Sequence, residues 1–296
     1  GVHTAIQPLL QRAAEDAVAE GMAELDAEYP AAAGAQIALV AVRLSDGAVV
    51  AMIGGRSYAD SPFNRARDAE RQAGSTIKPL TMLAAFEAGK AHPATRLQDQ
   101  PIRRTVGGVT WTPKNYDNTF QGEVTLRQAI EGSRNIPAIH LAESVGASKL
   151  QSFLRDTGLS HATHLPSAAL GSFEVTPMEL AGAYTAFDKG FAYQPRVLLA
   201  ISGPGGEEVL TLPPEGQLVA SEEAAALAVH VLQGVVVSGT GTKVTKYGVK
   251  TAYVAGKTGT TDDFRDAWFV GVTPELAVAV WVGKDEGNLG LSGSRA

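Results

Sequence analysis

Three short motifs, in a fixed order along the chain, combine residue types that could perform serine acyl transfer. They are Ser75-Thr-Ile-Lys78, Ser133-Arg-Asn135 and Lys257-Thr258-Gly259-Thr260. Together they can supply a nucleophile, a base, a proton relay, a cationic anchor and backbone donors. Each motif alone is weak, because serine and asparagine also cap helices and form turns. Their order, and the element boundary expected at each motif, favour a functional interpretation.

Ser75 and Lys78 are the candidate nucleophile and base. A serine hydroxyl must give up its proton as it attacks, and Lys78 lies one turn after Ser75 on the same face of an expected helix. A lysine in water is protonated at neutral pH. Burial in the apolar helix and the like charge of Lys257 would lower the pKa of Lys78, so that it could accept this proton.

The other two motifs offer candidates for the remaining roles. Ser133 could relay a proton to the leaving amine. Asn135 could hold a substrate amide or tie its own loop to the site, and the sequence favours neither. The expected oxyanion-hole donors are the backbone N–H groups of Ser75 and Thr260. The residues expected to bind the anionic end of a substrate are Lys257, Thr258, Gly259 and Thr260.

The composition is that of an ordinary globular protein. The 296 residues are 45% hydrophobic and carry a net charge of -6, which argues against a nucleic-acid partner. No apolar run approaches the roughly 20 residues of a bilayer span, and no N-terminal signal pattern is present. The chain opens with Gly1, so a missing anchor says little about a longer protein. The lack of cysteine excludes disulfides, thiolate catalysis and Cys-bound zinc.

The hydrophobic pattern predicts an α+β fold. Helices are expected at 4–26, 76–88, 125–130, 136–145, 149–157, 177–188 and 222–237. Strands are expected at 37–44, 48–53, 197–201, 209–212, 252–258, 267–272 and 276–282. Short loops between the last three strands favour antiparallel pairing, and their apolar content predicts helices on both faces. Residues 90–124 are expected to form a long, functional loop.

The chain resembles the transpeptidase domain of class A, bifunctional penicillin-binding proteins over nearly its whole length. The three motifs are those of penicillin-binding proteins and serine β-lactamases. Longer stretches agree as well: Phe63-Asn-Arg-Ala66, Arg71-Gln-Ala-Gly-Ser75, Trp111-Thr-Pro-Lys-Asn-Tyr-Asp117, Leu170-Gly171, Glu174-Val-Thr-Pro177 and Arg265-Asp-Ala-Trp-Phe-Val-Gly271.

The resemblance implies a serine β-lactamase/D-Ala-D-Ala transpeptidase-like fold. In that fold an antiparallel sheet is covered by helices on both faces and accompanied by an all-helical subdomain. Residues 1–296 would be one transpeptidase domain, with a sheet-containing subdomain (1–79 and 191–296) and a helical subdomain (80–190). The glycosyltransferase domain that precedes this region in the family is absent from the chain.

The family also continues into a final helix that covers the sheet, whereas this chain stops at Ser292-Gly-Ser-Arg-Ala296. We expect exposed apolar surface and lower stability at that end unless another segment fills the place.

The resemblance further implies a reaction. Ser75 would attack the penultimate D-alanine carbonyl of a peptidoglycan stem peptide, release the terminal D-alanine and pass the acyl group to an amine of a neighbouring stem. β-Lactam antibiotics would acylate the same serine. No metal or organic cofactor is implied. The location would be extracytoplasmic, and the whole protein would be membrane-anchored, with other cell-wall synthesis proteins as partners.

Related functions remain open. A serine β-lactamase needs a carboxylate that activates water over the acyl-enzyme; the nearest candidates are Glu174 and Glu179, and neither lies in a Glu-x-x-Leu-Asn context. A D,D-carboxypeptidase differs only in using water as the acceptor. A non-enzymatic β-lactam sensor would also be labelled at Ser75. His161 and His164 have a spacing compatible with metal binding, but no third ligand is evident, so we expect exposed loop residues.

Overall fold

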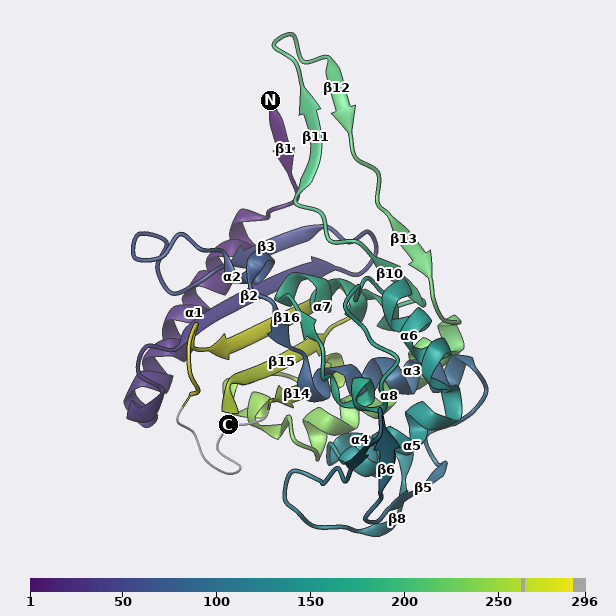
Figure 1. The fold of residues 1–296 in the computed structure, drawn as a ribbon. Helices are drawn as coiled ribbons and strands as arrows, with labels where there is room; N and C mark the ends of the chain where they lie inside the picture. Colours follow the sequence, from purple (N-terminus) through teal and green to yellow (C-terminus); the bar gives the residue numbers. More distant parts are fainter. Residues whose placement is uncertain (262–263, 290–296) are drawn as a thin grey trace.

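A five-stranded antiparallel sheet lies at the centre of the molecule (Figure 1). This computed structural model describes residues 1–261 and 264–289. The strand order is β14-β15-β16-β2-β3, and each neighbouring pair is antiparallel. The strands are β2 (Gln36–Arg43), β3 (Val49–Ile53), β14 (Ala255–Thr260), β15 (Asp266–Val272) and β16 (Leu276–Gly283). The strand that carries the third motif, β14, is therefore an edge strand.

Helices cover both faces of this sheet. Helix α1 (Pro8–Glu28) packs against β2 and β3, while α7 (Pro177–Ala183) and α8 (Glu222–Val237) pack on the other face. Side chains of β16 alternate between the two sides. Ala279 and Trp281 belong to the main core, whereas Val280 packs with residues of α1. This alternation follows from the period of two in a strand. The expected α+β class, with helices on both faces of an antiparallel sheet, is confirmed.

Helix α3 (Lys78–Glu87) is buried from Lys78 to Phe86 and packs against α5 and α8. A helix that is apolar on nearly all sides is typical of a core position. The other α-helices are α2 (Arg65–Asp68), α4 (Leu126–Glu131), α5 (Asn135–Val145) and α6 (Ala147–Asp156). The 3₁₀ turns are η1 (Pro30–Ala32), η2 (Gly74–Ile77), η3 (Pro166–Leu170), η4 (Tyr184–Phe187), η5 (Thr242–Tyr247) and η6 (Thr251–Tyr253).

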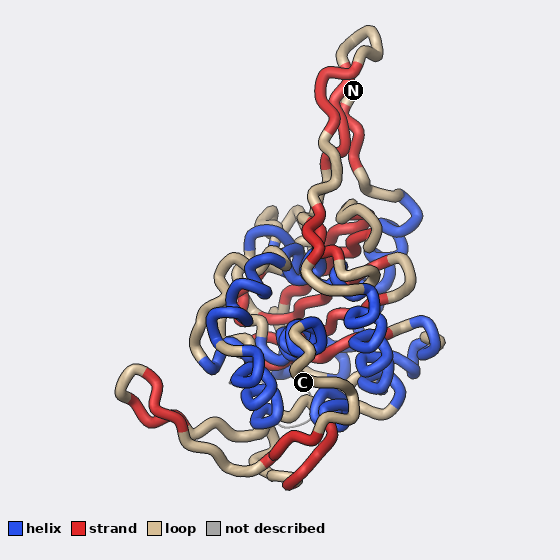
Figure 2. Tube along the Cα trace, turned by 90° about the vertical axis from the view of Figure 1, so that its right-hand side faces the viewer, coloured by secondary structure: helices blue, strands red, loops and turns tan. Residues whose placement is uncertain are grey.

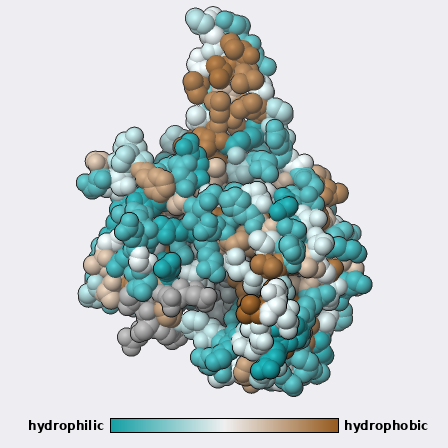
Figure 3. Space-filling view, in the orientation of Figure 1, coloured by the Kyte–Doolittle hydropathy of each residue, from teal (hydrophilic) through white to brown (hydrophobic). Residues whose placement is uncertain are grey.

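A second, three-stranded sheet projects from the body as an arm (Figures 1 and 2). It consists of β1 (Val2–Thr4), β11 (Leu198–Ser202) and β12 (Glu208–Thr211), in the order β1-β11-β12. Apolar residues gather on this arm (Figure 3), and Val2 and Val209 are mostly exposed. Other strands form two-stranded pairs, among them β10 (Phe191–Tyr193) with β13 (Gly216–Leu218), and β4 (Arg71–Gln72) with β9 (Glu174–Val175).

Several segments differ in detail from the sequence expectations, and two of them are 90–124 and 252–258. The stretch 90–124 contains short strand pairs, so residues 80–190 are not purely helical; each strand has three or four residues, too few for a recognisable alternation. They are β5 (Arg96–Asp99) with β8 (Gly122–Thr125), and β6 (Arg104–Val106) with β7 (Val109–Trp111). The strand expected at 252–258 is β14, which begins later and ends later than expected, at Ala255 and Thr260. These bounds are those of its pairing with β15, which runs from Ala255 to Thr260.

The structure also bears on the expectations about membranes and the chain end. Within residues 1–261 and 264–289, none of the helices is both long and apolar enough to cross a bilayer. The expectation about the end of the chain, Ser292 to Ala296, concerns residues outside the described part.

A close backbone contact holds the segment before the first motif. The N–H of Gly74 donates to the carbonyl oxygen of Gly171 at 3.1 Å. A Cβ added to Gly171 would lie 2.1 Å from the carbonyl oxygen of Gly74, and the φ angle of Gly171 is +71°. Glycine is thus required here for both its conformation and its small size.

We expect Gly171→Ala to lower the free energy of unfolding by at least about 3 kcal/mol, because it combines a left-handed backbone with a backbone clash. Gly89 has a similar φ of +63°, but nothing lies within 4 Å of its added Cβ. Gly89→Ala should therefore cost only about 1 kcal/mol. Urea unfolding measures both, and equal losses would show that the contact with Gly74 is unimportant.

Candidate active site

The first motif lies in the 3₁₀ turn η2 and the start of α3. A 3₁₀ helix has three residues per turn, so Ser75 and Lys78 lie on the same side. The turn is held in place by Tyr184, whose buried hydroxyl donates to the carbonyl oxygen of Thr76 at 2.6 Å. Ser75 is partly exposed, whereas Lys78 is 1% exposed. Part of Ser75 is therefore accessible to solvent, while Lys78 lies inside the protein.

The amine of Lys78 binds the second motif. Its Nζ donates to the Ser133 carbonyl oxygen at 2.6 Å, to Asn135 Oδ1 at 2.6 Å and to Ser133 Oγ at 3.3 Å. Among the described residues, no hydrogen bond joins Lys78 to the Ser75 hydroxyl. Catalytic hydrogen bonds are often formed only when substrate is bound. The structure thus brings the first and second motifs together through Lys78.

Lys257 brings in the third motif. Its fully buried Nζ donates to Ser133 Oγ at 2.9 Å and to the carbonyl oxygen of Thr258 at 2.9 Å. The Ser133 hydroxyl oxygen has two lone pairs, so it can accept from both Lys257 and Lys78. Lys78 and Lys257, which are 55 and 124 positions away from Ser133 in the sequence, therefore meet at its hydroxyl.

Burial lowers the pKa of both lysines, because a buried ammonium loses its hydration. For Lys257 this loss brings the pKa to about 7. For Lys78, burial and then the positive charges of Lys257 and Arg134 hold the pKa well below its ordinary value. The lowered pKa of Lys78 makes the neutral amine that a base requires easier to form than on a lysine in water.

The second motif connects α4 to α5 through an unusual backbone conformation. Ser133 has a φ of 52°, in the left-handed region that few non-glycine residues adopt. Asn135 is the first residue of α5, and its side-chain nitrogen donates to the carbonyl oxygen of Lys114 at 2.7 Å. Of the two roles left open for Asn135, the observed contacts correspond to the structural one, since its amide joins Lys78 to a neighbouring loop.

The third motif packs tightly against η2. A Cβ on Gly259 would lie 2.6 Å from the Thr76 side chain, so glycine lets the turn lie against β14. The N–H of Thr261 donates to Asp266 on β15 at 3.1 Å. Backbone N–H groups alternate in direction along an antiparallel strand, which turns the N–H of Thr260 away from β15. The Thr260 backbone also adjoins Gly74, the residue before Ser75.

Several buried polar residues around the site were not predicted from their types or spacing. Asp266 is buried and accepts hydrogen bonds from Trp281 Nε1 at 2.8 Å and from the Thr261 hydroxyl at 3.0 Å. Asp99 and Asn115 are buried next to the second motif. Asn115 and Asp266 lie in stretches that carry the family resemblance, which was the available signal.

His161 and His164 are exposed and lie outside the helices and strands, as expected. His161 Nε2 lies 3.9 Å from a carboxylate oxygen of Glu70, and the side chains of both residues are about half exposed. The described ranges contain no group of three or more His, Cys, Asp or Glu side chains placed to hold a metal ion.

The fold and the three motifs define a class of protein. Residues 37–294 match the family model described as the penicillin binding protein transpeptidase domain. The chain belongs to this family, and the resemblance to class A members is confirmed by relatives named penicillin-binding protein 1A and 1B.

Two relatives illustrate the similarity. The chain is 40% identical over 262 residues to penicillin-binding protein 1A of Aquifex aeolicus, covering 87% of this chain and 36% of that protein. It is 33% identical over 294 residues to penicillin-binding protein 1B of Vibrio cholerae, covering 96% of this chain and 37% of that protein. The chain thus spans about a third of the length of these relatives.

Solved structures agree in fold. Penicillin-binding protein 1A from Haemophilus influenzae has a TM-score of 0.80 and 29% identity, covering 86% of this chain and 44% of that chain. PonA1 from Mycobacterium tuberculosis in complex with penicillin V has a TM-score of 0.80 and 24% identity, covering 97% of this chain and 78% of that chain. The serine β-lactamase-like fold expected from the sequence is confirmed.

The low pKa of Lys257 predicts how stability depends on pH. Between pH 7 and 10 the unfolded chain binds more protons than the folded one, so Lys257 makes the free energy of unfolding rise with pH. Lys257→Met removes this contribution. The stability of the variant minus that of the wild type should therefore fall by up to about 1 kcal/mol per pH unit across this window. Urea unfolding at a series of pH values tests this, and a constant difference would contradict it.

Proposed function

We propose that this chain is a serine D,D-transpeptidase domain that cross-links peptidoglycan stem peptides through a seryl acyl-enzyme, and that β-lactams acylate the same serine. The observation that carries the proposal is that Lys78 and Lys257 both donate to the Ser133 hydroxyl. Lys78 itself follows Ser75 by one 3₁₀ turn. Membership of the transpeptidase family supports the reaction class. The likeness to PonA1, whose structure contains penicillin V, supports β-lactams as ligands.

In the proposed first step, Ser75 Oγ attacks the penultimate D-alanine carbonyl carbon and its proton passes to the neutral amine of Lys78. The negative charge that develops on the carbonyl oxygen is stabilised by the backbone N–H groups of Ser75 and Thr260. The short distance between η2 and β14 supports this pairing, since Gly259 allows the two elements to touch.

In the proposed second part, the terminal D-alanine leaves as an amine. Ser133, which accepts hydrogen bonds from Lys78 and Lys257, relays a proton to this amine. Lys257, Thr258, Gly259 and Thr260 line the β14 edge and bind the carboxylate of the donor peptide. An amine of a second stem peptide then attacks the ester carbon and gives a proton to Lys78. The bond between this carbon and Ser75 Oγ breaks as the new amide forms, and Oγ takes the proton back from Lys78.

The substrate also suggests where the domain acts. Peptidoglycan lies outside the cytoplasm, so we propose an extracytoplasmic location, with the whole protein anchored to the membrane and working with other cell-wall synthesis proteins. Membership of the penicillin binding protein transpeptidase family supports this location.

The β-lactamase alternative requires a carboxylate that activates water. Glu179 is engaged elsewhere, because its side chain accepts from the N–H and the hydroxyl of Thr176 in the cap of α7. Glu174 is exposed on β9. These contacts favour a slowly hydrolysed acyl-enzyme over rapid turnover.

Mass spectrometry after incubation with a penicillin tests the nucleophile. We expect a covalent adduct on the peptide that contains Ser75, and its loss in Ser75→Ala. The matched control is Ser133→Ala, which keeps the nucleophile and should still be labelled, but more slowly by about 10²-fold or more because the proton relay is lost. Labelling of Ser75→Ala at an unchanged rate would refute the assignment.

Two further measurements separate the alternatives. Deacylation over minutes or longer supports a transpeptidase, whereas rapid penicillin turnover supports a β-lactamase. Release of D-alanine from a stem peptide supports an enzyme, whereas labelling without any release supports a sensor. Cross-linked product, in addition to hydrolysed peptide, distinguishes the transpeptidase from a D,D-carboxypeptidase.

A further inference from the structure

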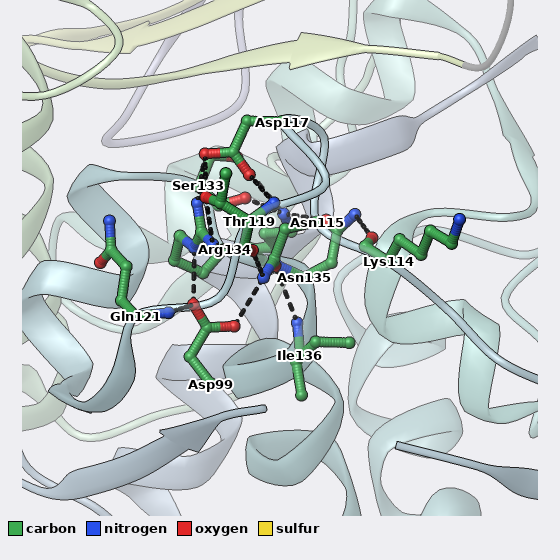
Figure 4. A network of polar contacts seen from close by, with 11 residues as sticks. Asp99, Lys114, Asn115, Asp117, Thr119, Gln121, Ser133, Arg134, Asn135 and Ile136 are labelled. Atoms are coloured by element: carbon green, nitrogen blue, oxygen red, sulfur yellow. Dashed lines mark hydrogen bonds and ion pairs between the residues drawn. The ribbon is translucent and has the colours of Figure 1, made fainter. Parts of the chain in front are cut away.

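A buried polar network joins the second motif to the segment between β7 and β8 (Figure 4). Its centre is the carboxylate of Asp99, which is fully buried at the end of β5. Asp99 accepts from Arg134 Nε at 2.8 Å, from Asn115 Nδ2 at 2.6 Å and from the N–H of Gln121 at 3.0 Å. A buried carboxylate is tolerated only with such partners.

Asn115 uses both ends of its buried side-chain amide. Its Oδ1 accepts the backbone N–H of Asn135 at 2.7 Å, and its Nδ2 donates to Asp99 and to the Thr119 carbonyl oxygen. Arg134, at the N-cap position of α5, makes no capping hydrogen bond with its own side chain. Asn115, 20 residues before Asn135, therefore supplies the capping hydrogen bond at the N-terminus of α5 from a separate segment.

The same segment also holds the side chain of Asn135. The carbonyl oxygen of Lys114 accepts from Asn135 Nδ2 at 2.7 Å, while Asn135 Oδ1 accepts from Lys78 Nζ at 2.6 Å. Adjacent residues thus fix both the backbone and the amide of Asn135. An amide held at two points has one orientation, with its oxygen directed at Lys78.

Arg134 fixes the neighbouring position in the same way. Arg134 is 5% exposed, and its guanidinium pairs with Asp99 and with Asp117, each at 2.8 Å. Ser133, immediately before it, keeps its left-handed backbone conformation. Such a conformation persists when the surroundings determine it. The anchored Arg134 on one side and α4 on the other provide this constraint.

We propose that Asn115 is a positioning residue of the acylation site. It acts through Asp99 and Asn135 to hold in place the oxygen atoms that accept hydrogen bonds from the Lys78 amine. The inference rests on the proposed function, since it assigns a role in acylation of Ser75. Asn115 has no described contact with Lys78 or Ser75 and acts only through its neighbours.

Acylation kinetics with a fluorescent penicillin test this role. Asn115→Asp keeps an acceptor for the Asn135 N–H but replaces the donor that now lies 2.6 Å from Asp99 Oδ1 with a second carboxylate oxygen. The rate constant at saturating penicillin should fall about 10- to 100-fold, because the base loses its fixed position. The dissociation constant of the non-covalent complex should change by less than about threefold, since the proposed binding edge on β14 is untouched.

Two further variants sharpen the test. The exchange Asn115→Asp with Asp99→Asn restores a donor–acceptor pair without changing the net charge. It should be acylated about tenfold faster than Asn115→Asp alone. Asn115→Ala removes the side-chain hydrogen bonds to Asp99, Thr119 and the Asn135 N–H without adding a charge. It should show the same result, a lower rate constant with little change in the dissociation constant.

Asp46→Asn is the control for a general loss of stability. Asp46 pairs with Arg43 and Arg196 in the turn between β2 and β3, at the opposite edge of the sheet from β14. This variant should lower the melting temperature but leave the acylation rate constant unchanged at a temperature where it is folded.

The outcomes are distinguishable. The positioning role is refuted if the acylation rate constants of both Asn115 variants lie within twofold of the wild-type value. It is also refuted if the rate constant of Asp46→Asn falls as far as theirs, or if the Asn115 variants change only the dissociation constant. The same holds if the exchange variant is no faster than Asn115→Asp. A wild-type protein that penicillin does not acylate refutes the proposed function and the positioning role together.

Discussion

Two buried lysine amines converge on the hydroxyl of Ser133, and this arrangement constrains the rest of the site. Burying a charged amine costs free energy, and a second one nearby adds repulsion. The acceptors around Lys78 and Lys257 are hydroxyl, carbonyl and amide oxygens, and no carboxylate is within hydrogen-bond distance of either Nζ in the described ranges. A carboxylate partner would raise the pKa of an amine and keep it protonated, whereas neutral oxygens leave proton exchange accessible.

The carboxylates near the site are instead bound to other groups. Asp99 forms an ion pair with Arg134, and the positive charge of Arg134 helps to lower the pKa of Lys78. Asp266 binds the Trp281 indole and the Thr261 hydroxyl at the end of β14. Both carboxylates therefore fix backbone next to the motifs while staying out of contact with the amines. This separation allows the same region to be rigid and to hold amines of low pKa.

The sequence predicted what depends on neighbouring positions. The three-residue spacing of Ser75 and Lys78 places them on one side of a turn, and the apolar residues that follow predict burial of the lysine. It could not predict that Lys78 would bind Asn135, because that contact joins residues 57 positions apart. The bounds of β14 also depend on its partner, since Thr260 is strand only through pairing with Ala267. The capping role of Asn115 could not be predicted either, because it depends on a contact with the start of α5, 20 positions later in the sequence.

The contacts of Lys78 explain how a buried amine can serve as a base under the proposed mechanism. Loss of hydration favours the neutral form before the reaction, while the Ser133 carbonyl and Asn135 Oδ1, each at 2.6 Å, stabilise the ammonium that forms when Ser75 loses its proton. Because these oxygen atoms are already in place, little reorganisation is needed at the moment of proton transfer. The low pKa and the fixed acceptors therefore act on different protonation states of the same amine, which is why the position of Asn135 matters as much as the burial of Lys78.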